Sequence, residues 1–240
     1  MELYDKYQPV TWDIGVIQAC AEKVSRTIRE WSALDLWARD ENRICVTREC
    51  RSIHDAMLRM QPLGLADKFL LVESIDGRTA LFTNAFAPFT EMPTWYSARK
   101  LQVPAYYICN EPKTISRDQR SGRYGARVLE FRKPEDPYGQ QPTFRVAVIN
   151  DAGRWCFERY GDKQSFEEGQ VYKALRKPNR FTGEMLVRYC QQLKIPVYDS
   201  AWYSDRVTLI QGTPFRNVPG RSYEEARQEL RIDHRQPPRG

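Results

Sequence analysis

The side chains that most often carry catalysis are scarce in this sequence. Two histidines, His54 and His234, occur in 240 residues, and histidine is the commonest general base. Cys50 precedes His54 by four residues, but Ser52 is expected to begin a helix between them, so the two need not share a face. Cys45, Cys50 and His54 would supply three zinc ligands, and no fourth is visible nearby. We therefore predict no metal site and no Cys–His pair.

Other catalytic patterns are weak. The chain has neither the glycine-rich loop of nucleotide-binding ATPases nor a strand-linked dinucleotide fingerprint. Ser97 and Lys100 match the S-x-x-K pattern, which often occurs by chance. Carboxylate pairs such as Glu73 with Asp76 fall at predicted turns, where they are interpreted as solvated acids. Two distant carboxylates leave no local signature, so an acid-only glycosidase site stays an alternative. Otherwise we expect no enzyme and no cofactor.

Two segments, 91–100 and 199–206, combine aromatic and basic residues in the way that recognition sites do. Each places a tryptophan and a tyrosine beside basic side chains, in stretches predicted to be loops. Trp, Tyr and Arg are enriched at binding hot spots, and aromatic rings also stack on unpaired bases. The alternative is that both tryptophans close the core beneath loops. The predicted partner-binding residues are Trp95, Tyr96, Arg99, Lys100, Trp202, Tyr203 and Arg206.

The stretch VAVINDAGRWCFERYG, residues 146–161, poses a choice between a reactive site and a hairpin. Asn150, Asp151 and Gly153 lie between two predicted strands, and these residue types are common in turns. We therefore interpret the stretch as a bend. Segment 68–84, with an Asp-Gly pair between two apolar runs, predicts a second hairpin.

The elements around these segments follow from periodicity and capping signals. Apolar residues recur at three- or four-residue steps over 13–38, which predicts the longest helix. Ser52 followed by Asp55 resembles a capping box and predicts a second helix. Thr182 is the expected N-cap of a third helix within 179–193. Further strands are expected at 43–48, 103–109, 126–131, 144–149, 154–160, 195–199 and 206–211, and a short helix at 222–230.

These elements predict an α+β fold, in which N-terminal helices pack on a mixed or mainly antiparallel sheet with hairpins, joined by one later amphipathic helix. Residues 1–65 form a mainly helical part, and residues 66–213 form a sheet-rich part, expected to be one compact unit with it. Residues 214–240 form a tail rich in arginine and proline.

Composition excludes several classes of protein. The net charge is +6, from 37 basic and 31 acidic residues, and the basic residues are not gathered into the stripe typical of dedicated nucleic-acid binders. No apolar run reaches the ~18–20 residues that span a bilayer, and the first residues lack a secretory signal. The six cysteines are expected to be reduced thiols. The sequence predicts a cytoplasmic protein with no membrane partner.

Three motifs within residues 68–200 carry a resemblance to a group of uncharacterised bacterial proteins. They are G-R-W-x-F-E at 153–158, S-F-E at 165–167 and R-F-T-x-E-M-L at 180–186, with Ser165 where the group has proline. Such proteins resemble the immunity or accessory proteins found beside bacterial toxins. The resemblance implies binding to another protein and carries no catalytic residues.

Two functions from different classes follow. The first is a protein-interaction module, of which the narrower form is an immunity protein that binds and neutralises a cognate toxin. Its basic charge suits an acidic or neutral toxin better than a basic nuclease. The second is nucleic-acid binding by a basic sheet decorated with aromatic residues, which predicts binding that weakens as salt rises.

Overall fold

The computed structural model describes residues 2–34, 46–64, 67–116, 118, 121–134, 142–212 and 219–232. Nine strands form one sheet in the order β2-β9-β3-β4-β1-β5-β6-β7-β8, and every neighbouring pair is antiparallel. The strands are β1 (Asp13–Ile17), β2 (Val46–Cys50), β3 (Lys68–Ser74), β4 (Thr79–Thr83), β5 (Ala105–Glu111), β6 (Ala126–Arg132), β7 (Phe144–Asp151), β8 (Arg154–Gly161) and β9 (Tyr203–Gln211). The helices are α1 (Glu2–Lys6), α2 (Ala21–Leu34), α3 (Ile53–Arg59), α4 (Glu91–Leu101), α5 (Gly183–Gln192) and α6 (Tyr223–Glu229). This architecture confirms the predicted α+β class.

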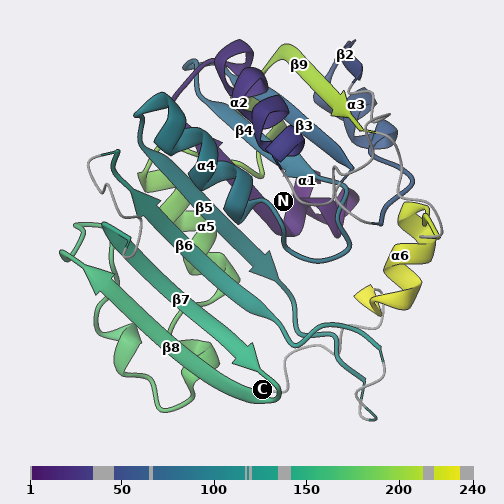
Figure 1. Cartoon of the computed structure of the whole chain (residues 1–240). Helices are drawn as coiled ribbons and strands as arrows, with labels where there is room; N and C mark the ends of the chain where they lie inside the picture. The colour runs from purple at the N-terminus through teal and green to yellow at the C-terminus, as the bar shows by residue number, and fades with distance from the viewer. Residues whose placement is uncertain are drawn as a thin grey trace.

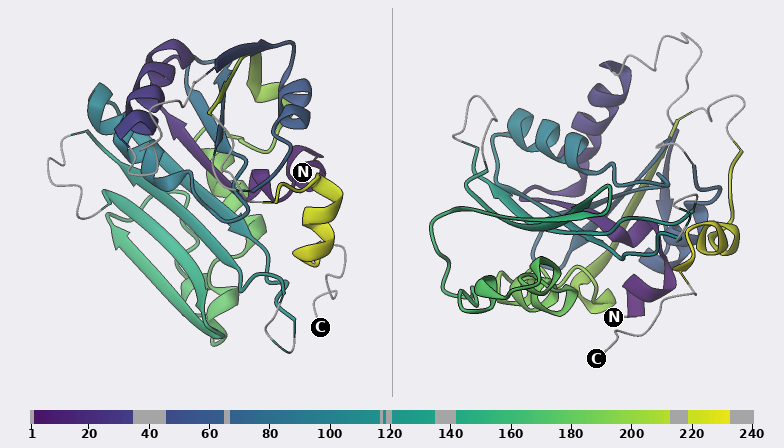
Figure 2. Two further views of the ribbon diagram at one scale, coloured as in Figure 1. Left: turned by 45° about the vertical axis from the view of Figure 1, so that its right-hand side comes forward. Right: turned by 90° about the horizontal axis from the view of Figure 1, so that it is seen from below.

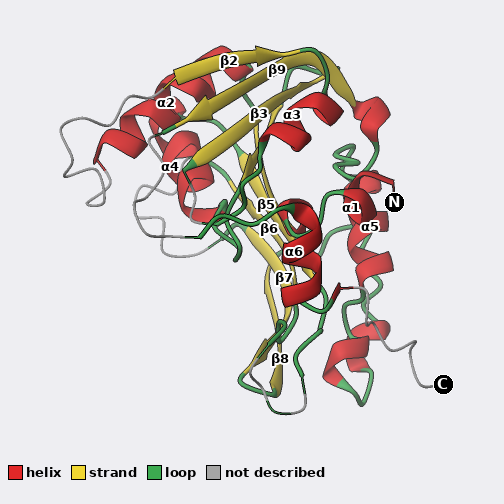
Figure 3. Cartoon of the chain, turned by 90° about the vertical axis from the view of Figure 1, so that its right-hand side faces the viewer, coloured by secondary structure: helices red, strands yellow, loops and turns green. Residues whose placement is uncertain are grey.

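The sheet separates two layers of helices. Helices α2 and α4 lie on one face, and α5 lies on the other (Figures 1 and 2). Figure 3 shows the same division from the side, with α1, α3 and α6 on the α5 side of a twisted sheet. Side chains alternate between the two layers, since Ile14 and Val16 join the core under α1, α3 and α5, whereas Ile17 joins the core under α2.

Local signals at helix starts and turns are confirmed. Ser52 caps α3 by accepting the backbone N–H of Asp55 at 3.2 Å. Thr182 caps α5 in the same way, through the N–H of Met185 at 3.3 Å. The expected short helix is α6, which begins with a full capping box. These positions are set by neighbouring residues, which explains why the sequence alone locates them.

The two predicted hairpins are β3–β4 and β7–β8. Gly77 in the first has φ +80°, and Ala152 and Gly153 in the second have φ +46° and +96°. The Oδ1 atom of Asn150 accepts the N–H of Gly153 at 2.7 Å and closes the second turn. The stretch 146–161 is therefore a bend, as the turn chemistry predicts.

The helix predicted over 13–38 is wrong at its start. Residues 13–17 are β1, which pairs with β4 and β5 in the middle of the sheet. All five residues of this strand are buried, so the alternation of apolar and polar residues typical of a half-exposed strand is hidden. The helix begins at Ala21, and residues 35–38 lie outside the described part of the chain.

The strand predicted at 195–199 is also absent from the structure. Pro196 has no N–H to donate to a ladder, and the backbone turns back on itself, with the N–H of Val197 bonded to the carbonyl of Ile195 at 2.7 Å. Val197 and Tyr198 are nevertheless buried, which accounts for the apolar pattern. The last strand, β9, begins at Tyr203.

Both ends of the described chain join the same body. Residues 1–65 contribute β1 to the middle of the sheet and β2 to one edge. Near the other end, Leu63 forms a bridge with Arg221, and the hydroxyl of Tyr223 donates to the carbonyl of Met57 at 2.8 Å. Within the predicted tail, residues 214–218 and 233–240 lie outside the described part. No helix in the described part is long and apolar enough to cross a membrane.

Candidate functional site

Segment 91–100, expected to be a loop, belongs to helix α4. Pro93 lies in the first turn, where a backbone N–H would have no partner within the helix, so the proline does not interrupt it. Asp13 of β1 anchors the start of the helix. Its Oδ2 atom accepts the backbone N–H groups of Phe89 and Thr90 at 2.7 Å and the Thr90 hydroxyl at 2.8 Å. Burial raises the pKa of Asp13, despite these hydrogen bonds.

Gly15 lets α4 lie directly on β1. A Cβ atom at this position would meet the side chain of Thr94, with Oγ1 only 1.8 Å away. Thr94 is buried and donates its hydroxyl to the carbonyl of Thr90 at 2.6 Å. The close contact and the Asp13 anchor together fix where α4 presents its aromatic side chains.

A cavity of about 380 Å³ runs beside α4 and brings together residues from three elements. Trp95 and Tyr96 come from α4, Trp31 from α2 and Arg132 from the end of β6. Trp31 is held by edge-on contacts with Phe69 and Phe89, whose ring centroids lie 5.8 and 5.7 Å away. We call this cavity the α4 groove, and its defining residues are Trp31, Met92, Trp95, Tyr96, Arg99 and Arg132.

Cations dominate the charge of the α4 groove. Its charged lining residues are Arg99, Arg132, Lys133 and Glu91. The Arg132 guanidinium lies over the Trp95 ring, 4.7 Å from its centroid, which is a cation–π contact. Glu91 has a local partner, since its Oε1 accepts the indole N–H of Trp95 at 3.5 Å.

A buried carboxylate sets the position of Arg132. The Oε1 atom of Glu130 accepts the Arg132 Nε–H at 2.7 Å, and the other carboxylate oxygen pairs with Arg145. The side chain of Glu130 is 1% exposed, so it is a fixed anion beneath the surface. Arg145 in turn pairs with Glu158 of β8 at 3.1 Å. These ion pairs link β6, β7 and β8, and Figure 1 shows that α4 does not extend over β7 and β8.

Four predicted site residues lie together on α4. Trp95 and Tyr96 are half-buried, whereas Arg99 and Lys100 are exposed. The Lys100 ammonium lies 5.6 Å from the centroid of the Tyr96 ring. Trp95, Tyr96 and Arg99 line the α4 groove, and Lys100 stands beside it. The sequence thus predicts one side of the groove.

The other three predicted residues lie elsewhere. Trp202 and Tyr203 are buried in the core on the α5 side, and the Tyr203 hydroxyl donates to the carbonyl of Val197 at 2.7 Å. The alternative that a tryptophan closes the core therefore describes Trp202. Arg206 is exposed and pairs with Glu73 at 3.1 Å.

Glu73 itself corrects an expectation. It is buried, and its second carboxylate oxygen accepts the N–H of Ala21 at 3.2 Å, at the start of α2. The interpretation of Glu73 as a solvated turn acid is wrong. Asp76 does lie in the turn, where hydrogen bonds from Arg78 and Ser74 lower its pKa to about 2.

In the part of the chain that the structure describes, the residues considered for catalysis lie apart from one another. Ser97 is buried and accepts the hydroxyl of Thr27 at 2.8 Å, whereas Lys100 is exposed. His54 contacts the Tyr7 hydroxyl at 3.0 Å through Nδ1. Among the described residues, no cluster of three or more His, Cys, Asp or Glu side chains is arranged to hold a metal. Cys45 and His234 lie outside those residues.

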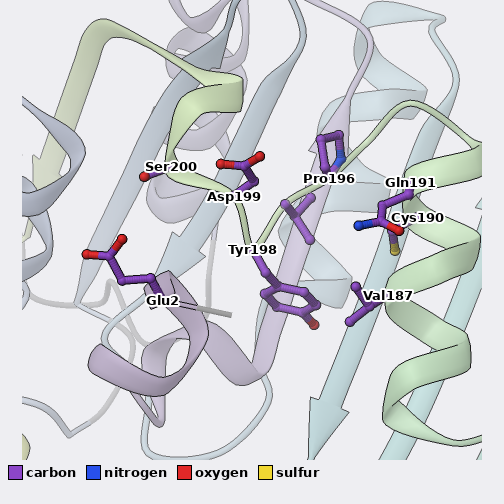
Figure 4. Close-up of a pocket in the computed structure, with 9 residues that line it drawn as sticks. Glu2, Val187, Cys190, Gln191, Pro196, Tyr198, Asp199 and Ser200 are labelled. Carbon is purple, nitrogen blue, oxygen red and sulfur yellow. The ribbon is translucent and has the colours of Figure 1, made fainter.

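A second cavity, of about 310 Å³, lies between α1 and α5. Figure 4 shows Tyr198 between Glu2 on α1 and Val187 on α5, with Cys190 farther along α5. Burial raises the pKa of Cys190 to about 12, so its thiol is protonated at neutral pH and is a poor nucleophile. We find no catalytic arrangement in this cavity.

The sequence misses the residues that complete the α4 groove. Trp31 and Arg132 come from α2 and β6, far from α4 along the chain, and meet it only through the sheet order. Local patterns hold no signal for this meeting. The one available hint is the basic pair at 132–133, directly after a predicted strand.

Comparison of the chain with protein-family models, with curated proteins and with solved structures finds no match in any of the three. The resemblance to immunity and accessory proteins is neither supported nor contradicted by these comparisons. The geometry of the α4 groove is therefore the basis on which a function is proposed.

Proposed function

We propose that this chain is a protein-binding module that uses the α4 groove to hold an acidic and apolar segment of a partner. One observation carries the proposal: the groove combines half-buried aromatic rings with an excess of cations. Tryptophan, tyrosine and arginine contribute most to binding when they surround a pocket that excludes water. The basic lining would attract a partner of opposite charge.

The exposed apolar surface of the groove supports a protein partner. Met92 is 67% exposed at the rim, although it is a large apolar side chain. Methionine adapts to irregular apolar surfaces and is common at binding faces. Arg132 is already oriented by Glu130, so little side-chain entropy is lost when it meets a partner's carboxylate.

The test is affinity capture with a charge-reversed groove and a matched control. The groove variant is Met92→Asp/Arg99→Glu, and both positions are exposed. The control, Leu175→Asp/Arg176→Glu, makes the same chemical change at exposed residues far along the chain. After nuclease treatment, we expect wild type and control to retain the same protein in stoichiometric amount and the groove variant to lose it.

The captured protein is then purified, and its affinity for each variant is measured by titration calorimetry. Reversal of a central contact is expected to weaken binding by about tenfold or more, because hot-spot residues contribute more than about 1 kcal/mol each. Equal affinity for wild type and groove variant would contradict the proposal, and so would loss of the partner in the control alone.

Neutralisation of a bacterial toxin is the narrower form of this proposal, and it follows from the sequence resemblance. If the captured partner is a toxin, its activity should fall as the chain is added, in proportion to the complex formed. The groove variant should then protect poorly, whereas the control should protect fully.

Single-stranded nucleic acid is the second candidate, favoured by the cations around Trp95 and Trp31. Aromatic rings in a basic groove stack on bases of any sequence. Titration of a labelled oligonucleotide at increasing salt tests it, because log K should fall with log salt by about 0.7 for each phosphate neutralised. Binding absent at low salt, or unchanged by salt, would remove this candidate.

A further inference from the structure

On the sheet face opposite α4, two polar residues of β5 and β6 lie at the edge of the apolar core. Arg127 of β6 and Asn110 of β5 are direct cross-strand neighbours. Both line a cavity with Tyr4 of α1 and the first residues of α5. Leu129, the next β6 residue on this face, is fully buried in the core. A charged side chain at this place requires a specific explanation, because removing a guanidinium from water is costly.

Arg127 has no counter-ion among the described residues. No carboxylate in the described part of the chain forms an ion pair with it, and its buried Nε atom has no hydrogen-bond partner among the described residues. Burial lowers the pKa of the Arg127 guanidinium, and the charge of Glu184 opposes this from outside ion-pair distance. Arg127 is half-buried, and only its Nε atom is both buried and unpaired, so an anion that enters the cavity would offset part of the cost of holding this charge away from water.

Asn110 offers a second unused polar group at the same place. The residue is 6% exposed, and its backbone carbonyl accepts the hydroxyl of Tyr4 at 2.6 Å. Its side-chain amide makes no hydrogen bond within the described part of the chain, and it lines the cavity. The amide lies against the start of α5, because a Cβ atom at Gly183 would be 3.2 Å from Oδ1 of Asn110.

The first turn of α5 supplies the third component. This helix has ten residues, and its dipole favours negative charge at the N-terminus. The pKa of Glu184 shows the effect, since it is lowered first by its own backbone N–H, then by the Thr182 hydroxyl, with a further contribution from Arg127. The cavity therefore already stabilises one anion of the chain at its mouth.

We propose that this cavity binds a phosphate group, held by Arg127, Asn110 and the first turn of α5. A guanidinium fork, an amide N–H and helix N–H groups are the donors that phosphate oxygens accept most readily. The cavity has a volume of about 580 Å³, within the ~300–1,000 Å³ range of small-molecule sites. It has room for a phosphorylated small molecule as well as for the free ion. The site is independent of the α4 groove, which lies on the other face of the sheet.

The first test is a nuclear magnetic resonance titration of the whole chain with inorganic phosphate. We expect saturable shifts of the Gly183 and Glu184 amide signals, which sodium chloride at equal ionic strength does not produce. In Arg127→Met the affinity should fall by about tenfold or more, because charge-assisted hydrogen bonds are lost. The control Arg154→Met removes an exposed arginine of β8 and should bind as wild type does.

A second measurement separates loss of binding from loss of folding. Without phosphate, Arg127→Met should melt at a higher temperature than wild type, because it removes a half-buried charge whose Nε atom is buried and unpaired. Phosphate should raise the Tm of wild type and leave that of Arg127→Met unchanged. Ribose 5-phosphate distinguishes the two sources of the group: tighter binding than inorganic phosphate identifies a phosphorylated small molecule, and equal binding identifies the free ion.

The proposal is overturned if phosphate leaves the Gly183 and Glu184 signals unmoved. Equal shifts in Arg127→Met, or the same shifts with chloride, would also overturn it. A lower Tm for Arg127→Met without phosphate would show that the guanidinium already has a partner within the chain. This result would also overturn the proposal.

Discussion

Replacing Gly15 by alanine tests whether α4 is held directly on β1. The added Cβ atom would lie 1.8 Å from Oγ1 and 3.0 Å from Cβ of Thr94. Rotation of Thr94 about χ1 relieves the contact only in part, because it can move Oγ1 away but leaves the Thr94 Cβ at 3.0 Å. Either the helix or the strand must therefore move away.

The magnitude follows from three contributions. Forcing a methyl group into a packed position costs about 1–3 kcal/mol. Disturbing the 2.6 Å hydrogen bond from Thr94 to Thr90 adds about 1 kcal/mol. Alanine restricts the unfolded chain more than glycine does, which stabilises the folded state by about 0.4–1 kcal/mol and offsets part of this loss. We expect Gly15→Ala to lower the free energy of unfolding by about 1–3.6 kcal/mol in total.

Urea unfolding followed by far-ultraviolet circular dichroism measures this loss, with the slope m unchanged. Thr94→Ala is the partner variant, and alone it should cost about 1 kcal/mol. Combined with Thr94→Ala, the Gly15→Ala change should cost less than in the wild-type background, because the clashing Oγ1 and Cγ2 atoms are gone. A Gly15→Ala stability within about 0.5 kcal/mol of wild type would refute the reasoning, as would an equal cost in both backgrounds.

Substitutions at three buried carboxylates, Asp13, Glu167 and Glu130, give the further predictions. Asp13→Ala leaves buried N–H groups before α4 unpaired and should cost about 2–5 kcal/mol in urea unfolding. Because burial raises the folded-state pKa of Asp13 above 3.8, wild type should gain stability relative to Asp13→Asn as pH falls through the folded-state pKa, and a constant difference would contradict this. Glu167 shows the opposite sign: burial raises its pKa, but hydrogen bonds, first from Arg159, outweigh this and lower it below 4.5. The ionised Glu167 carboxylate should therefore stabilise the fold relative to Glu167→Gln above pH 4.5, and this stabilisation should disappear as pH falls through the folded-state pKa. Glu130→Ala leaves Arg132 and Arg145 without this carboxylate and should lower the free energy of unfolding by about 3–5 kcal/mol. The tryptophan fluorescence should also change, and an unchanged spectrum would contradict the role given to Arg132 over Trp95.

The sequence predicts those parts of the fold that neighbouring residues determine. The caps at Ser52 and Thr182 and the turn at Gly77 each depend on a few adjacent positions, and all three are confirmed. β1 is missed because its environment comes from elsewhere. Its partners β4 and β5 and the helices on both faces decide its conformation, and none of these is close in sequence.

The candidate site shows the same limit. Trp95 and Trp202 stand in similar local sequences, yet Trp95 lines a groove and Trp202 is buried in the core. The difference arises from what packs over each ring. Arg127 is missed altogether, because a single arginine in a strand has the same local pattern whether it meets solvent or a cavity.

The sheet order has a consequence for how the chain is made. β9 lies between β2 and β3, although it follows both by a long stretch of chain. During synthesis, β5 to β8 can pair with their sequence neighbours as they emerge, whereas the β3 edge has no partner until residue 211 has left the ribosome. Pairs so distant in sequence close slowly. An unpaired edge in an apolar strand is a template for other strands, so β9 acts late as the segment that protects the nascent protein from aggregation.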